Sequence, residues 1–139
     1  PDAKRFENWE KNFANHLGMG VAVEYALDAG LDRIWAQVER NAATLREKLA
    51  TLPGVFVRDI GEVKGGIVTF EIEGHDPEAV NHALRKRWKI NTSASTVSST
   101  RFDMESRQIE RMVRSSVHYF TSDEEIDLLA SAIEEIART

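Results

Sequence analysis

The segment from Val113 to Asp127 constrains the fold most, because it predicts a strand, a turn and a helix in immediate succession. Polar and mainly apolar residues alternate, so an extended strand would place each set on its own face. One set is Val113, Ser115, Val117 and Tyr119; the opposite set holds Arg114, Ser116 and His118. Thr121 or Ser122 can cap a following helix, whose acidic first turn, Asp123–Glu125, matches the helix dipole.

Arg114 is the charged residue that this pattern singles out. It lies in the middle of the predicted strand, between Val113 and Val117. The planar guanidinium suits a carboxylate or a phosphate, and removing it from water without a partner would be costly. The sequence therefore favours an anion-binding arginine on a rigid strand. The alternative is an ion pair on a solvated sheet face, for which the chain offers 23 acidic residues.

Hydrophobic periodicity divides the rest of the chain into helices and strands. The charged residues before Asn12 show no clear period, so we expect an extended arm there. An apolar helical stripe then ends at Gly30, and a second helix starts at Asp32 and stops before Pro53-Gly54. Asp76 and Pro77 open a further helix that ends at Trp88 and buries Val80 and Leu84. The predicted strands are Val55–Val57, Ile67–Ile72, Ile90–Ser95 and the segment from Val113. In the second of these strands, Val68, Phe70 and Ile72 should face the core. The last helix is expected to direct its apolar residues inward, namely Ile126, Leu129, Ile133 and Ile136.

This element order predicts an α/β (α+β sandwich) fold: a small, largely antiparallel sheet with helices packed on one face. Residues 1–11 would form an arm or linker, and residues 12–139 one domain that includes its leading connecting helix. The chain starts at Pro1 without a methionine, so we expect a piece of a longer polypeptide.

Composition narrows the class of protein. The 42% apolar and 29% charged residues are typical of a globular protein, and no apolar run is long enough to span a bilayer. A net charge of −5 argues against nucleic-acid binding. The basic run Arg85–Lys89 is the exception, and its position at a predicted helix end gives it a structural explanation. The chain has no cysteine, which is compatible with a cytoplasmic protein, and its four histidines have no metal-ligand spacing.

Several segments together resemble one protein family. They are Arg5-Phe6-Glu7, Gly18–Ala22 with Tyr25, Leu52–Val55, Gly66–Phe70, and Val113–Ser116 continuing through Tyr119 to Glu125-Ile126-Asp127. Over nearly its whole length the chain resembles the C-terminal portion of class V aminotransferases, the cysteine desulfurase and isopenicillin-N-epimerase-like group of fold-type I pyridoxal-phosphate enzymes.

The resemblance implies that the parent protein is a homodimeric pyridoxal-phosphate enzyme acting on an amino acid, with Arg114 binding the α-carboxylate of the substrate. It implies no catalytic residue in this chain, because the Schiff-base lysine of the family lies upstream, and so no covalently bound cofactor. Asn12 matches the region of a cofactor-phosphate contact from the partner subunit. The family's catalytic cysteine would fall between Ser93 and Thr100, where this chain has none. Transaminase, lyase or epimerase chemistry therefore fits better than persulfide formation.

A second interpretation stays open. The chain alone shows no nucleophile beside a base in a recognisable spacing. It could be a stand-alone ligand-sensing or interaction domain with a ferredoxin-like sheet and no chemistry of its own.

Overall fold

The computed structural model describes residues 3–7 and 10–139. The chain divides into two compact units, Pro1–Ile34 and Trp35–Thr139. The first unit contains the 3₁₀ turn η1 (Ala3–Phe6) and helix α1 (Phe13–Ala29). The expected extended arm is therefore wrong over Ala3–Phe6, where the backbone forms a helical turn; residues 1–2 and 8–9 of the arm lie outside the described residues.

Helix α1 begins and ends where the sequence predicts. The Asn12 Oδ1 atom accepts a hydrogen bond from the Asn15 backbone N–H at 3.0 Å, and Gly30 follows the helix with a φ of 89°. None of its residues is buried. The predicted stripe is exposed to between 66% and 73% at Phe13, Leu17, Val21 and Tyr25. A helix as rich in apolar residues as α1 is normally buried inside a larger protein.

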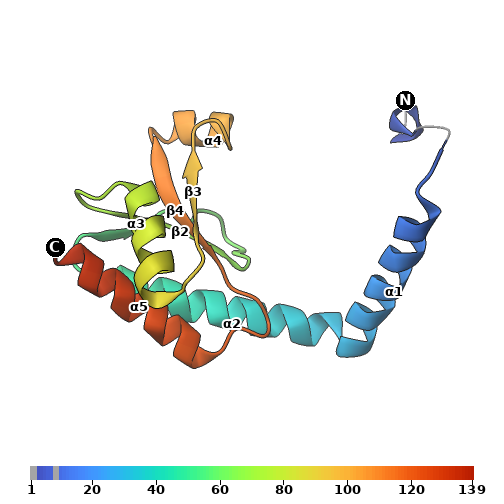
Figure 1. Cartoon of the computed structure of the whole chain (residues 1–139), viewed down its shortest axis with the longest axis horizontal. Coiled ribbons are helices and arrows are strands. Elements are labelled where there is room, and N and C mark those ends of the chain that lie inside the picture. The colour runs from blue at the N-terminus through green and yellow to red at the C-terminus, as the bar shows by residue number, and fades with distance from the viewer. Residues whose placement is uncertain (1–2, 8–9) are drawn as a thin grey trace. The chain divides into compact units, whose positions relative to one another are not determined.

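The second unit is built on a four-stranded antiparallel sheet in the order β1-β2-β4-β3 (Figure 1). The strands are β1 (Val55–Val57), β2 (Ile67–Ile72), β3 (Ser93–Thr96) and β4 (Arg111–Ser116). The side chains of Val68, Phe70 and Ile72 are buried, as predicted. The predicted antiparallel sheet is confirmed.

Helices cover the apolar face of this sheet. They are α2 (Leu31–Ala50), α3 (Pro77–Ala83) with the π-helical turn η2 (Leu84–Trp88), and α5 (Asp123–Ala137). One core joins them to the sheet, with Leu45 of α2, Phe70 of β2, Leu84 of η2 and Ile133 of α5 fully buried. Ion pairs from Arg40 and Lys48 of α2 to Asp123 and Asp127 link α2 to α5.

One helix was not predicted. The short helix α4 (Arg101–Ser106) lies at the far end of the β3–β4 pair (Figure 1). It buries Met104 in a small separate cluster with Ile109 and Met112. Strand β4 begins at Arg111, two residues before the predicted start at Val113.

A largely buried ion pair ties α2 to the segment between β1 and β2. The Arg46 Nε atom lies 2.7 Å from Asp59 Oδ2, and the two side chains are only 13% and 10% exposed. Arg46 Nη2 also donates to the backbone carbonyls of Gly65 and Ile67. The other Asp59 oxygen accepts from the N–H and the hydroxyl of Thr69. This network fixes the β1–β2 connection against the helix layer.

Candidate functional site

Arg114 lies in the middle of an inner strand. In β4 it stands opposite Thr69 of β2 on one side and Ser93 of β3 on the other. Its neighbours Val113 and Ser115 are buried, whereas Arg114 itself is exposed on the opposite face of the sheet. Pairing on both sides gives its backbone a stiff support. The guanidinium is therefore presented on the sheet face turned away from the helix-covered core.

The ion-pair alternative for Arg114 is not what the structure shows. No described residue forms a hydrogen bond or ion pair with its guanidinium, although Arg111, three residues earlier, pairs with Asp76 at 3.1 Å. Several other arginines of the domain are likewise paired with carboxylates. With respect to the described residues, Arg114 thus keeps its donors available at an accessible position.

The alternation predicted from the sequence continues past the end of β4. Ser116 and His118 are exposed like Arg114, and Val117 is buried like Val113. The His118 ring stacks on Phe120 with centroids 4.4 Å apart and lies 4.7 Å from the ring of Tyr119. Arg114, Ser116 and His118 consequently form one polar row along the exposed side.

Two contacts hold the end of this strand in place. The Val117 N–H donates to the Gly66 carbonyl at 2.9 Å. A Cβ atom at Gly66 would lie 2.6 Å from the Val117 carbonyl oxygen and 2.8 Å from Val38, so only glycine fits there without movement. On the helix side, the fully buried Asn41 donates from Nδ2 to the carbonyls of His118 and Thr121 at 3.0 and 2.9 Å.

The turn then leads into α5 through a capping box. The Ser122 hydroxyl accepts from the Glu125 N–H, and the Glu125 carboxylate accepts from the Ser122 N–H. Of the two predicted caps, Ser122 is the one used. The pKa of Glu124 lies below its ordinary value, mainly because the carboxylate accepts a hydrogen bond from the backbone N–H of Glu124 itself. A hydrogen bond from the Ser122 side chain lowers this pKa further.

The segment Ser93–Thr100 stands beside the strand that carries Arg114. Ser93 is paired directly with Arg114, and the hydroxyls of Thr96 and Ser98 lie 2.9 Å apart. These hydroxyl groups occupy the region where the resemblance places a cysteine in the family. The segment can donate and accept hydrogen bonds, but it offers no thiolate.

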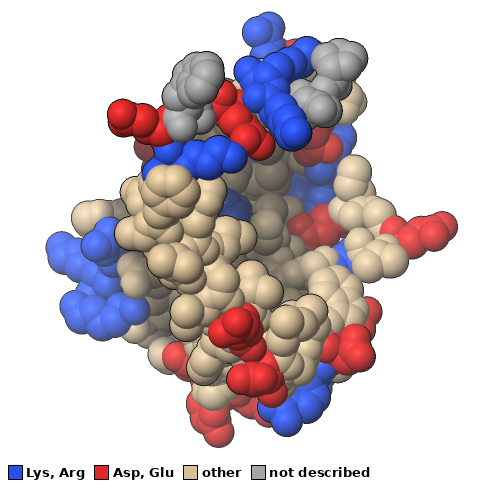
Figure 2. Space-filling model, turned by 90° about the vertical axis from the view of Figure 1, so that its right-hand side faces the viewer, with Lys and Arg blue, Asp and Glu red and all other residues tan. Residues whose placement is uncertain are grey.

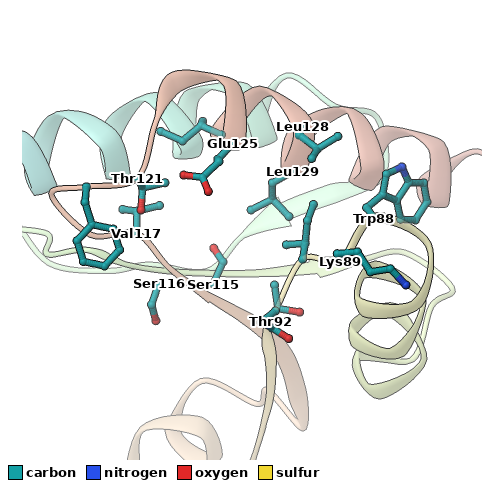
Figure 3. A pocket seen from close by; sticks show the side chains of 14 residues that line it. Trp88, Lys89, Thr92, Ser115, Ser116, Val117, Thr121, Glu125, Leu128 and Leu129 are labelled. Carbon is teal, nitrogen blue, oxygen red and sulfur yellow. The ribbon is translucent and has the colours of Figure 1, made fainter.

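A cavity of about 530 Å³ opens between α5, the end of β4 and the segment after η2. Figure 3 shows Glu125 and Leu129 projecting from α5 toward Ser115 and Val117, with Trp88 at the other end. Arg114 does not line this cavity. Sequence reasoning missed it, because its walls come from three separate parts of the chain.

The remaining candidates are Asn12, possible metal-ligating side chains and the lysines. Asn12 belongs to the first unit, where it caps α1. The described residues contain no group of three or more His, Asp or Glu side chains that could hold a metal ion. None of the six lysines is buried; Lys48, for example, is half-exposed and pairs with Asp127.

Surface charge and helix hydropathy were compared over the described residues. On the face shown in Figure 2, both basic and acidic side chains are present. Among the described residues, no helix combines the length and the hydropathy required for a membrane span.

Comparison with known proteins identifies the family. The sequence model of the family described as Aminotransferase class-V matches residues 2–129. The chain belongs to this family. The resemblance recognised in the sequence is thereby confirmed.

The similar proteins include cysteine desulfurases. The cysteine desulfurase of Synechococcus elongatus is 29% identical over 139 residues, which are 98% of this chain but 21% of that protein. The apo cysteine desulfurase from Thermococcus onnurineus NA1 superposes with a TM-score of 0.87 at 25% identity, covering 98% of this chain and 34% of that one. The cystine C-S lyase C-DES has a TM-score of 0.72 at 20% identity, covering 95% and 32%. The chain therefore spans between a fifth and a third of the length of these proteins.

Proposed function

We propose that this chain is the C-terminal part of a pyridoxal-phosphate-dependent enzyme that acts on an amino acid, and that Arg114 binds the α-carboxylate of the substrate. The observation that carries the proposal is a guanidinium that pairs with none of the described residues, on a strand hydrogen-bonded to a neighbour on each side. A guanidinium forms two parallel hydrogen bonds with a carboxylate, which fixes the orientation of the group as well as its position. Holding the carboxylate in this way directs the amino group of the substrate toward one reaction site.

Helix α1 supports the idea of a larger enzyme. Its uncovered apolar surface includes Leu17 and Val21, exposed to 73% and 66%. Burying such a side chain stabilises a protein by roughly 1.5–3 kcal/mol. A longer polypeptide, as in the relatives that this chain matches only in part, would cover this surface.

The cofactor is proposed from the family. One solved C-DES structure is described as holding glycine covalently linked to the pyridoxal-phosphate cofactor. Bound pyridoxal phosphate supplies an electron sink for reactions at the amino acid's α-carbon. The absence of a buried lysine in the described residues does not fit covalent attachment to this chain, so we place the Schiff-base lysine elsewhere in the longer protein. Asn12 stays a candidate phosphate contact through its amide Nδ2, because its Oδ1 caps α1.

The absence of cysteine narrows the reaction type. Protein persulfide formation requires a thiolate, and this chain has none. Among the chemistries of this family, we propose transamination, a lyase reaction or epimerisation. A homodimer in the cytoplasm remains the prediction for the full-length protein.

The experiment compares two arginines of the same strand in the full-length protein. Arg114→Ala removes the unpaired guanidinium, and Arg111→Ala, the control, removes an exposed one paired with Asp76. Amino-acid affinity is followed through the absorption of the bound cofactor. We expect Arg114→Ala to weaken binding by about 2–5 kcal/mol, the range for losing one partner of a buried charge pair, and Arg111→Ala to have little effect. Unchanged affinity in Arg114→Ala would exclude the carboxylate role.

The stand-alone ligand-sensing domain is the second candidate, and the cavity beside Trp88 and Leu129 is the observation that favours it. The reading frame upstream of Pro1 discriminates between the two. An in-frame extension of a few hundred residues containing a strand-borne lysine favours the enzyme, whereas an initiator methionine just before Pro1 favours the module.

A further inference from the structure

We propose that His118 is a second substrate-binding residue, which contacts the polar end of the substrate's side chain while Arg114 holds the α-carboxylate. The inference rests on the proposed function of Arg114. It adds a substrate class: amino acids whose side chain ends in a hydrogen-bonding group, such as a thiol, a hydroxyl or a carboxylate.

The backbone of His118 is held more firmly than a surface histidine requires. Its carbonyl accepts from Asn41 Nδ2 at 3.0 Å and from the Thr121 N–H at 3.1 Å, and its own N–H donates to Thr121 Oγ1 at 2.9 Å. Both backbone groups are therefore satisfied within the turn.

The imidazole ring of His118 is supported by two aromatic side chains. It stacks on Phe120 with an interplanar angle of 27° and meets Tyr119 at 53°. Neither ring nitrogen hydrogen-bonds to a described residue, and the side chain is exposed. Aromatic neighbours restrict the movement of the ring without using its nitrogen atoms, so these atoms stay available for hydrogen bonds in a defined position. Such preorganisation strengthens ligand binding because less freedom is lost when the contact forms.

Asn41 is the positioning residue in this arrangement. It is fully buried in α2, in the stripe that also carries Ala42 and Leu45. Because both Nδ2 hydrogens face the carbonyls of His118 and Thr121, its Oδ1 accepts from Gln37 Nε2 at 2.9 Å. A buried polar side chain whose two Nδ2 hydrogens both bond to one turn fixes where that turn lies.

The spacing along the strand separates the roles of the two side chains. His118 follows Arg114 by four residues, which in an extended chain puts their Cα atoms about 13 Å apart. Side chains on one face of an extended chain stand roughly parallel, so those of Arg114 and His118 point to separate parts of a ligand. We therefore assign the carboxylate to Arg114 and the side chain of the bound amino acid to His118.

The test measures selectivity in the full-length protein. Apparent dissociation constants for L-cysteine, L-serine and L-aspartate are each compared with that for L-alanine, by titration of the cofactor's absorption. We expect at least one polar amino acid to bind better than alanine, and His118→Ala to reduce that preference by about tenfold, the upper range for one neutral hydrogen bond. The matched control is His82→Ala, which removes an exposed histidine of α3.

A second variant tests the positioning residue. Asn41→Leu removes the hydrogen bonds to the turn at similar side-chain volume, and we expect the same loss of preference with alanine affinity largely kept. A lower unfolding temperature alone would reflect only a structural role. A folded Asn41→Leu protein that keeps the full preference would overturn the positioning role.

The outcomes separate this inference from the proposed function. If Arg114→Ala weakens all amino acids equally while His118→Ala leaves the preference unchanged, the inference fails and the carboxylate role stands. Equal weakening of polar amino acids and alanine by His118→Ala, or no preference in the unmodified protein, also overturns it. If Arg114→Ala has no effect, the proposed function fails first.

Discussion

Replacing Arg46 tests how the sheet is fixed to the helix layer. Arg46→Met keeps the aliphatic part of the side chain but removes the guanidinium that bonds to Asp59, Gly65 and Ile67. Breaking a buried ion pair by removing one partner costs about 3–5 kcal/mol, because the other charge stays buried without compensation. Asp59 would retain two hydrogen bonds from Thr69, so we expect the lower end, about 3 kcal/mol.

The assay is urea unfolding of the 139-residue chain, with Arg40→Met as the matched control. Arg40 also pairs with a carboxylate, Asp123, but the two side chains are 49% and 63% exposed. Exposed pairs contribute below about 1 kcal/mol. In thermal unfolding, 3 kcal/mol corresponds to a decrease of roughly 6–12 °C in Tm for a chain of this size.

Burial is the variable that separates the two variants. Equal losses of stability in Arg46→Met and Arg40→Met would refute the reasoning. The double variant Arg46→Met with Asp59→Asn removes both charges, so we expect it to be more stable than Arg46→Met alone.

Two further predictions concern the strand end and the cofactor. Gly66→Ala should destabilise the domain by about 1–3 kcal/mol in urea unfolding, because the new Cβ meets the Val117 backbone. Gly65→Ala is the control and should be nearly neutral, because a Cβ there has nothing within 4 Å. Similar effects of both variants would show that the close approach at Gly66 is unimportant. In the second experiment, pyridoxal phosphate is added to the 139-residue chain, reduced with borohydride, and the labelled lysines are measured by mass spectrometry. We expect sub-stoichiometric labelling, because none of the lysines is buried. Stoichiometric labelling of one lysine would contradict the proposed location of the Schiff-base lysine.

Much of the fold follows from local sequence signals. The alternation from Val113 to Val117 predicts the inner strand, and Asp76 with Pro77 predicts the start of α3. These signals depend on residues close together in the chain, whose periodicity or capping chemistry is visible without tertiary structure. Helix α4 was not predicted because its six residues bury only Met104, and one buried residue shows no helical period.

The site was predictable only in part, for a related reason. Arg114 is conspicuous because a charge interrupts an apolar strand. The absence of an ion partner could not be inferred, since it depends on residues distant in sequence. The role of Asn41 was hidden for the same reason: its contacts lie 77 and 80 residues away. The cavity beside Trp88 likewise needs three segments brought together by folding.

The central claim is tested most directly by comparing one amino acid with its carboxamide, which lacks the negative charge and has an NH2 donor in place of one acceptor oxygen. In the full-length protein we predict that the amino acid binds far more tightly than the carboxamide, and that Arg114→Ala makes the two affinities nearly equal. A preference for the carboxylate that persists undiminished in Arg114→Ala would contradict the account.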